Sequence, residues 1–220
     1  MQKSESGYST EFEEPSPLWR AWNPYRVEGG VFQSTCLSPW QWYRELLTYF
    51  DKSRAYRSNN TIIGRLLGFS DRIDYNHTNG IGWLLLLGFL DPCPVFDLTG
   101  KTVSARIRGV DWKPNGSQTY FWLQGLGSGF TSNWAYVAMP LNRFLEDGAW
   151  HDIAIEIETD ASKWQYAGNN IHQKDRDLYR PQTMESAISN VDNLHFITVM
   201  PTHCANFPSG KFEISRFSIA

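Results

Sequence analysis

Apolar and polar residues alternate in short stretches through the second half of the chain. In residues 102–108 and 150–158, apolar side chains occupy every second position. Because successive side chains of a strand point to opposite faces, this period of two predicts half-buried strands. Further stretches of this kind lie at 119–124, 134–139, 195–200 and 211–219. Short strands at such spacing, separated by turn residues, predict an all-β fold, an antiparallel jelly-roll β-sandwich.

Other stretches break this pattern. Residues 38–50 combine a capping serine, a proline at the first position and apolar residues at helical spacing, which predicts one short helix. The apolar run 81–90 is too short to cross a bilayer and suits a buried strand or helix. A strand is expected near 61–67. Residues 164–189 are predicted to form a long charged loop with one helical turn at 183–188.

The first 37 residues are expected to form an extended N-terminal arm, followed by a sandwich domain over 38–220. Prolines punctuate the arm, and Gly29-Gly30 predicts a turn. The aromatic side chains of this irregular segment must be buried against their own domain or against a neighbour. We interpret three of them as interface residues: Trp19, Trp22 and Tyr25.

Composition narrows the classes of partner. The chain is 41% hydrophobic and 20% charged, which fits a globular domain with a real core. Its net charge is -3 and no basic block appears, so nucleic acid is not expected as a partner. The polar, acidic start has no secretory signal, so we expect a protein made in the cytoplasm that does not span a membrane. The sequence does not fix its final compartment.

The cysteines and histidines form no recognisable site. Cys36, Cys93 and Cys204 lack CxxC spacing, which argues against zinc and favours three buried thiols over one bridge. The histidines lack an HExxH pattern. We therefore predict no catalytic residue and no metal-ligating residue from motifs.

Aromatic residues make up 15% of the chain, with ten tryptophans. If the apolar sets face the core, the alternate set faces outward and interleaves aromatic planes with polar groups. Such a surface suits a glycan, because rings stack on sugars while polar groups bind hydroxyls. The alternative is a covered face on which these side chains are packing contacts. The candidate glycan-binding residues are Arg106, Tyr120, Trp122, Gln124, Trp134, Tyr136 and Glu156.

Three short motifs carry a family resemblance. Asp97-Leu98-Thr99-Gly100 precedes a predicted strand, Asp147-Gly148-Ala149-Trp150-His151 starts another, and Ser209-Gly210-Lys211-Phe212-Glu213-Ile214 opens the last. Residues 91–220 thus resemble the carbohydrate-binding modules and concanavalin A-like jelly rolls. The resemblance implies a lectin-like sandwich. Such modules often hold a structural Ca²⁺ ion, for which Asp91, Asp97 and Asp192 are candidates, with ordinary turn roles as the alternative. No other cofactor is expected.

The resemblance also raises glycoside hydrolysis, which needs two carboxyl groups at a defined separation, about 5–5.5 Å or about 6.5–9.5 Å. Asp152 and Glu156 lie four residues apart on a predicted strand, about 13 Å, which is too far. Glu156 and Glu158 are roughly 7 Å apart, but the ExDxxE motif of concanavalin-like hydrolases is absent. An enzyme is therefore not favoured.

The leading hypothesis is a non-catalytic, carbohydrate-binding-like β-sandwich that serves as an accessory or structural subunit of a larger assembly. Its partners would be other protein subunits, for example of a bacterial or phage particle or of a membrane complex to which it is peripheral, and a polysaccharide. The alternative is a free, lectin-like glycan-binding protein. A polysaccharide hydrolase or lyase is the second alternative.

Overall fold

The structure is a computed structural model that describes residues 7–21, 23–36, 81–126, 131–170, 182–201 and 207–220. The described residues form short helical turns at η2 (Asn142–Phe144) and η3 (Ala161–Lys163), and one short helix, α4 (Met184–Ile188). Their strands are β1 (Tyr8–Thr10), β2 (Trp19–Arg20), β3 (Tyr25–Glu28), β4 (Val31–Cys36), β5 (Ile81–Leu90), β6 (Thr102–Lys113), β7 (Gln118–Leu126), β8 (Thr131–Tyr136), β9 (His151–Glu156), β10 (Trp164–Asn170), β11 (Val191–Pro201) and β12 (Ser209–Ile219).

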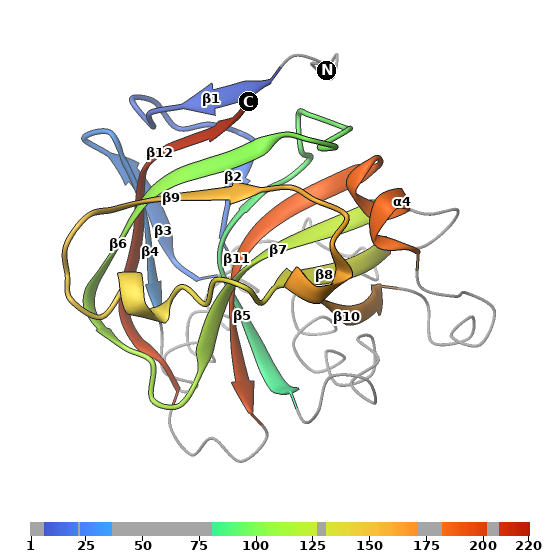
Figure 1. Cartoon of the computed structure of the whole chain (residues 1–220). Helices are drawn as coiled ribbons and strands as arrows, with labels where there is room; N and C mark the ends of the chain where they lie inside the picture. Colours follow the sequence, from blue (N-terminus) through green and yellow to red (C-terminus); the bar gives the residue numbers. More distant parts are fainter. Residues whose placement is uncertain (1–6, 22, 37–80, 127–130, 171–181, 202–206) are drawn as a thin grey trace, which may run out of the picture.

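The strands pair into two antiparallel sheets that pack face to face (Figure 1). The first sheet has the order β3-β4-β12-β6-β9, with β1 also paired to β12, and the second has the order β10-β8-β7-β11-β5-β2. From β5 onward the chain passes repeatedly between the sheets: β6, β9 and β12 join the first sheet, and the strands between them join the second. The predicted antiparallel jelly-roll sandwich is confirmed.

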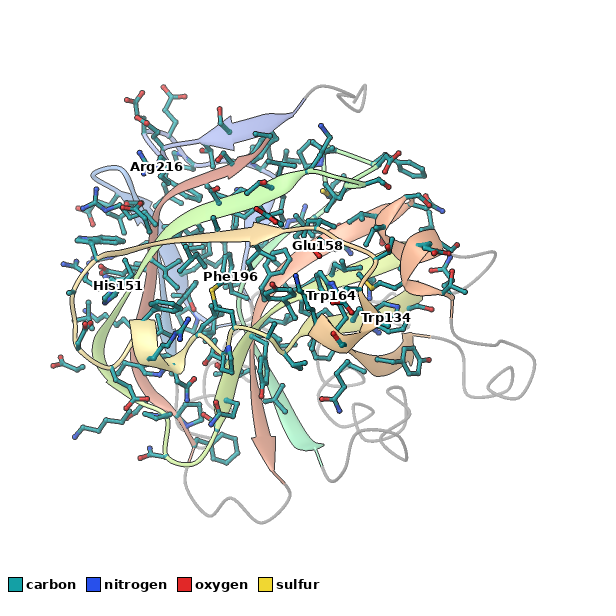
Figure 2. The ribbon with its side chains drawn as sticks, viewed as in Figure 1. Trp134, His151, Glu158, Trp164, Phe196 and Arg216 are labelled. Carbon is teal, nitrogen blue, oxygen red and sulfur yellow. The ribbon has the colours of Figure 1, made fainter. Side chains whose placement is uncertain are left out.

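Aromatic rings fill the space between the sheets. Phe196 of β11 lies at the centre, between the two layers (Figure 2). Its ring centroid is 5.9 Å from that of Phe121 and 5.2 Å from that of Phe212, so rings of both sheets meet there. The predicted inward sets of β6 and β9 are confirmed, because Val103, Ala105, Ile107, Ile153 and Ile155 are all buried.

The N-terminal segment differs from the predicted irregular arm. Its described residues form β1 to β4, which pair within the two sheets. Trp19 is only 1% exposed, and its ring meets those of Phe12 and Phe217 at 5.2 and 4.9 Å. The predicted turn at Gly29-Gly30 is present between β3 and β4, with φ of +59° and +74°, conformations that glycine adopts without strain. The boundary drawn at residue 37 is untested, because residues 37–80 are not described.

Four other sequence predictions have different outcomes. The helix at 38–50 and the strand near 61–67 lie outside the described residues. The apolar run 81–90 is strand β5. The loop predicted over 164–189 is wrong at its start, where Trp164–Asn170 form β10 and pair with β8. The helical turn at its end is confirmed as α4, whose N-terminal amide of Ser186 donates to Thr183 Oγ1 at 3.2 Å.

The three family motifs each lead into a strand of the first sheet. Asp97 Oδ1 accepts the Thr99 amide at 2.8 Å just before β6. Asp147 Oδ1 accepts the Ala149 amide at 2.9 Å just before β9. Hydrogen bonds that an amide donates to the carboxylate two residues before it close tight turns, so these two motifs are turn signals.

Candidate functional site

The candidate glycan-binding residues do not share one surface. Tyr120, Trp122 and Gln124 lie on the outer face of the second sheet, whereas Arg106 and Glu156 lie on the outer face of the first. The prediction of a single face was wrong because these strands alternate between two sheets, and alternation along a strand does not reveal its sheet.

Trp134 and Tyr136 also depart from the prediction, since they point into the sandwich. Both are partly buried against the main core. The Tyr136 ring packs edge-on against Trp164 at 4.9 Å, and that of Trp134 meets Tyr166 at 5.4 Å (Trp134 and Trp164 are labelled in Figure 2). In β8 it is the small residue Ala135 that faces outward. These aromatic side chains therefore contribute packing rather than a ligand surface.

A row of amide side chains crosses the outer face of the second sheet, from β11 to β8. Asn193 Nδ2 donates to Gln124 Oε1 at 2.9 Å, and Gln124 Nε2 donates to Asn133 Oδ1 at 2.9 Å. The indole Nε1 of Trp122 donates to the same Asn133 oxygen at 3.2 Å. This chain of hydrogen bonds orients the amides and the indole together, but Asn193 Oδ1 is buried and has no hydrogen-bond partner in the part of the chain that the structure describes.

His195 lies next to this row on the same face, in the next cross-strand position along β11. It lies two residues after Asn193 on β11 and is the cross-strand partner of both Trp122 and Phe89. Its ring stacks on Phe89, with centroids 5.8 Å apart and planes inclined by 19°. Both ring nitrogens are buried, and neither has a hydrogen-bond partner among the described residues. Burial away from water disfavours the charged imidazolium and lowers the pKa of His195 to about 3, so the ring is neutral near pH 7.

We call Asn133, Gln124, Asn193 and His195 the amide–imidazole row. An apolar bed surrounds it on the same face, formed by Leu86, Phe89, Trp122, Ala135, Ala167, Ile197 and Val199, with Tyr120 and Val137 partly buried beside them. Trp122 is 2% exposed and Gln124 5%, whereas Asn193 and His195 are partly exposed residues whose unpartnered polar atoms are buried. Buried polar atoms without partners inside an apolar bed are rare, and a ligand or ordered water is their usual explanation.

The outer face of the first sheet, by contrast, is open and charged. Arg106 and Glu156 are exposed there, but they lie in different cross-strand rows: Arg106 is paired with Asp152, and Glu156 with Thr102. Asp152 and Glu156 both lie on β9, four residues apart, so the separation that argued against a hydrolase applies to the folded strand. Glu158 forms an ion pair with Lys163 at 2.8 Å.

A shallow depression of about 720 Å³ lies beside η2. Asn142 in its wall serves the backbone, since its side chain accepts the Thr119 amide and donates to the Ser117 carbonyl, both at 2.8 Å. At its rim Asp147 pairs with His151 at 2.8 Å, and this hydrogen bond lowers the pKa of the exposed Asp147 carboxyl. The depression is lined by Gln118, Pro140, Asn142, Arg143, Glu146 and Asp147.

The predicted interface residues have three different outcomes. Trp19 belongs to the core and is not available to a partner, because β2 pairs with β5 and draws its ring between the sheets. Tyr25 is 46% exposed on the edge strand β3. Trp22 lies outside the described residues.

Metal and thiol chemistry finds little support in the described part of the chain. No group of three His, Cys, Asp or Glu residues there is placed to hold an ion. Among the Ca²⁺ candidates, Asp97 closes a turn and Asp192 Oδ2 accepts Asn193 Nδ2 at 3.2 Å, while Asp91 follows β5. Cys36 and Cys93 are buried, and the Cys93 thiol donates to the Val95 carbonyl at 3.1 Å, while burial raises the pKa of the Cys36 thiol to about 12. Cys204 is not among the described residues.

Sequence reasoning missed Asn133, Asn193 and His195. Asn193 and His195 alternate with the buried residues Leu194 and Phe196, so the period of two along β11 places them together on the outer side. That signal was available in the sequence. What it could not supply was the pairing of β11 with β7, which brings these residues beside Gln124 and Trp122.

No protein-family model and no curated protein matches the chain. Among solved structures, it is similar to one from work on endo-acting O-glycanases of the human gut microbiota, with 9% identity, a TM-score of 0.44, and 97% and 98% of the two chains covered. The solution structure of CtCBM11 is similar with 17% identity and a TM-score of 0.41, over 100% of this chain and 97% of that chain. The crystal structure of LamA from Z. galactanivorans in complex with laminaritriose and laminaritetraose is similar with 10% identity and a TM-score of 0.39, over 96% of this chain and 97% of that chain. Likenesses at this level identify neither a family nor a ligand.

Within the described residues, no helix has the length and apolar character needed to cross a membrane.

Proposed function

We propose that this chain is a non-catalytic, glycan-binding β-sandwich whose ligand binds to the outer face of the second sheet, at the amide–imidazole row. The observation that carries the proposal is a set of three buried polar atoms that have no partner among the described residues, Asn193 Oδ1 and the two ring nitrogens of His195, on one strand beside an indole.

The chemistry of the row suits the hydroxyl groups of a sugar. A neutral imidazole offers one donor and one acceptor, and an amide oxygen accepts, whereas each hydroxyl both donates and accepts. Neighbouring hydroxyls on a pyranose can therefore satisfy His195 and Asn193 together. The apolar side of the same ring would contact Trp122 or Phe89, as aromatic planes do in carbohydrate sites.

The composition of this face also supports a binding role without catalysis. The outward residues of β7 and β8 here are amides, aromatic or small residues, and within the described residues the carboxyl group that is hydrogen-bonded to the row is that of Asp192, which accepts from Asn193. Glycoside hydrolysis generally uses two carboxyl groups that flank the scissile bond. The row can orient a sugar, but it lacks the pair that would protonate and displace the leaving group.

Access to the row has a free-energy cost. Because Trp122 and the imidazole nitrogens are enclosed, a glycan must bind a state in which this face is accessible. The apparent affinity is then reduced by the fraction of molecules in that state. Binding should therefore alter the environment of Trp122 and change tryptophan fluorescence.

The test is affinity electrophoresis of the full chain in gels that contain a mixed-linkage β-glucan, a xylan or a galactomannan. We expect retardation by at least one of these neutral polysaccharides, with loss of retardation in Asn193→Ala and His195→Phe. His151→Phe is the matched control, because that histidine lies at the far edge of the first sheet. Equal retardation of all three variants, or no retardation of the wild type by any neutral glycan on a broad array, would contradict the proposal.

Service as a subunit of a larger assembly is a separate part of the proposed function. It no longer draws support from Trp19, which is a core residue. Tyr25 on the edge of the first sheet remains the exposed aromatic contact that this role would use. Tyr25→Ala should release the protein from a complex in source extract, as size fractionation would show, and it should leave glycan binding intact.

A further inference from the structure

Three arginines lie close together on the outer face of the first sheet. Arg216 of β12 is the direct cross-strand partner of Arg106 of β6, and Arg108 follows two residues later on β6. Like charges placed directly opposite each other destabilise an antiparallel pair. Folding alone therefore does not favour this arrangement. Figure 2 shows Arg216 directed away from the two sheets.

Two carboxylates neutralise two of the three guanidinium groups. Asp152 Oδ1 accepts from Arg216 at 2.9 Å, and Glu213 Oε2 accepts from Arg108 Nε at 2.9 Å. Arg106 is exposed and forms no ion pair within the described part of the chain. Asp152 is also the cross-strand partner of Arg106 and could pair with it instead. One guanidinium then remains unpaired in either arrangement.

The pairing of Arg108 is fixed by a wider network. The Glu213 side chain is only 5% exposed, although it points to the outer face. Gln33 Nε2 donates to its second oxygen, and Arg26 Nε donates to Gln33 Oε1 at 3.1 Å. Glu213 is therefore held by two strands, β4 and β6, and is not free to neutralise Arg106.

Trp150 completes the surface. The Arg108 guanidinium lies 4.4 Å from its ring centroid, and that of Arg106 lies 5.9 Å away. The indole is partly exposed, so an aromatic plane and an unpaired guanidinium face solvent together. The next cross-strand row carries only small side chains, those of Ser218, Ser104 and Ala154.

We propose that this arginine–tryptophan face, defined by Arg106, Arg108, Trp150, Asp152 and Arg216, binds a polysaccharide that carries carboxylate groups, that is, a polyuronate. A planar guanidinium binds a carboxylate through two parallel hydrogen bonds, and an aromatic plane takes the sugar ring. The whole chain has a net charge of -3, so general attraction of polyanions does not account for such binding. The site lies on the opposite sheet from the amide–imidazole row and is independent of it.

The experiment is affinity electrophoresis in gels that contain polygalacturonate or its fully methyl-esterified form, whose carboxylates are neutral. We expect retardation of the wild type by polygalacturonate alone. Arg106→Gln should weaken the affinity for polygalacturonate about tenfold. Arg106→Lys keeps the positive charge but loses the two parallel N–H donors of the guanidinium, and it should weaken the affinity less. Trp150→Ala should also weaken it.

Two control variants test whether the binding belongs to this face. Arg143→Gln removes an exposed arginine that lies over Phe144, outside this face, and should bind like the wild type. His195→Phe should retain polygalacturonate binding even if it loses a neutral glycan, so failure of one site is distinguishable from failure of the other. The proposal is overturned if the wild type is not retarded, if the esterified polymer retards it equally, or if Arg143→Gln weakens binding as much as Arg106→Gln.

Discussion

Replacing His195 with phenylalanine should remove much of the acid sensitivity of this fold. The pKa of His195 is lowered from 6.5 to about 3 because burial disfavours the imidazolium. A group whose pKa is lowered on folding contributes stability that is present above its unfolded pKa and is lost as pH falls. Between pH 6.5 and about 3 the unfolded chain binds a proton at this ring and the folded chain does not.

The magnitude follows from the displacement of the pKa. At pH 5 the unfolded histidine lies 1.5 units below its midpoint of 6.5, which corresponds to a loss of about 2 kcal/mol relative to pH 7. Phenylalanine cannot bind a proton, and its ring can keep the stack on Phe89. It also removes two buried nitrogens without partners, each of which costs about 1–3 kcal/mol if water does not reach it.

The assay is urea unfolding followed by tryptophan fluorescence at pH 7 and pH 5. We expect His195→Phe to be at least as stable as the wild type at pH 7 and to lose about 2 kcal/mol less than the wild type on acidification. His151→Phe removes a partly buried histidine on the other sheet that is paired with Asp147 and should keep the wild-type loss. If the wild type and His195→Phe lose the same free energy of unfolding between these two pH values, His195 is not the source of the acid sensitivity.

Three further predictions test the packing that supports the two faces. Phe196→Ala should destabilise the fold by about 3–5 kcal/mol, because the Phe196 ring is buried between the sheets. Thermal unfolding measures the loss, and a value below about 1 kcal/mol would place Phe196 outside the core. Glu213→Ala should cost about 1–3 kcal/mol in urea unfolding, because it leaves Arg108 and Gln33 without their acceptor, and high salt should not abolish the difference. Gly125→Ala should also destabilise the fold, since a Cβ there would lie 2.6 Å from the Ala187 Cα. Thermal melting followed by circular dichroism measures the loss. Gly29→Ala is the comparison, because that position has a φ of +59° but no atom within 4 Å of the added Cβ.

Which side of a strand is buried could be predicted wherever apolar residues alternate cleanly. In β6 and β9 the sequence has small or branched apolar residues at every second position, and those residues are buried. In residues 134–139 the alternation places the aromatic residues Trp134 and Tyr136 on one side and Ala135 and Val137 on the other. Both sides are apolar, so the hydrophobic pattern does not decide between them, and Trp134 was assigned to the wrong face.

The candidate site needed information that a single strand does not contain. The row from Asn193 through Gln124 to Asn133 joins residues that are up to 69 positions apart along the chain. Their meeting depends on β11 pairing with β7 and on β7 pairing with β8. Long-range strand pairing of this kind is set by the packing of the whole sandwich, not by local propensity.

His195 illustrates why the site residues were harder to predict than the fold. A histidine between Leu194 and Phe196 fits the alternation of a strand with a polar, solvent-facing side. Only the structure shows that its nitrogens are enclosed and have no partners. Such a residue departs from the rule that buried polar groups are hydrogen-bonded, and departures of this kind are expected at binding sites.

We propose that His195 serves a ligand at the expense of stability. The most direct test measures both properties on one preparation of His195→Phe: urea unfolding at pH 7, and calorimetric titration with the neutral oligosaccharide that binds the wild type. We expect equal or greater stability together with loss of glycan binding, while His151→Phe binds normally. A His195→Phe variant that is as stable as the wild type and binds the glycan with unchanged affinity would show that His195 does not serve the ligand.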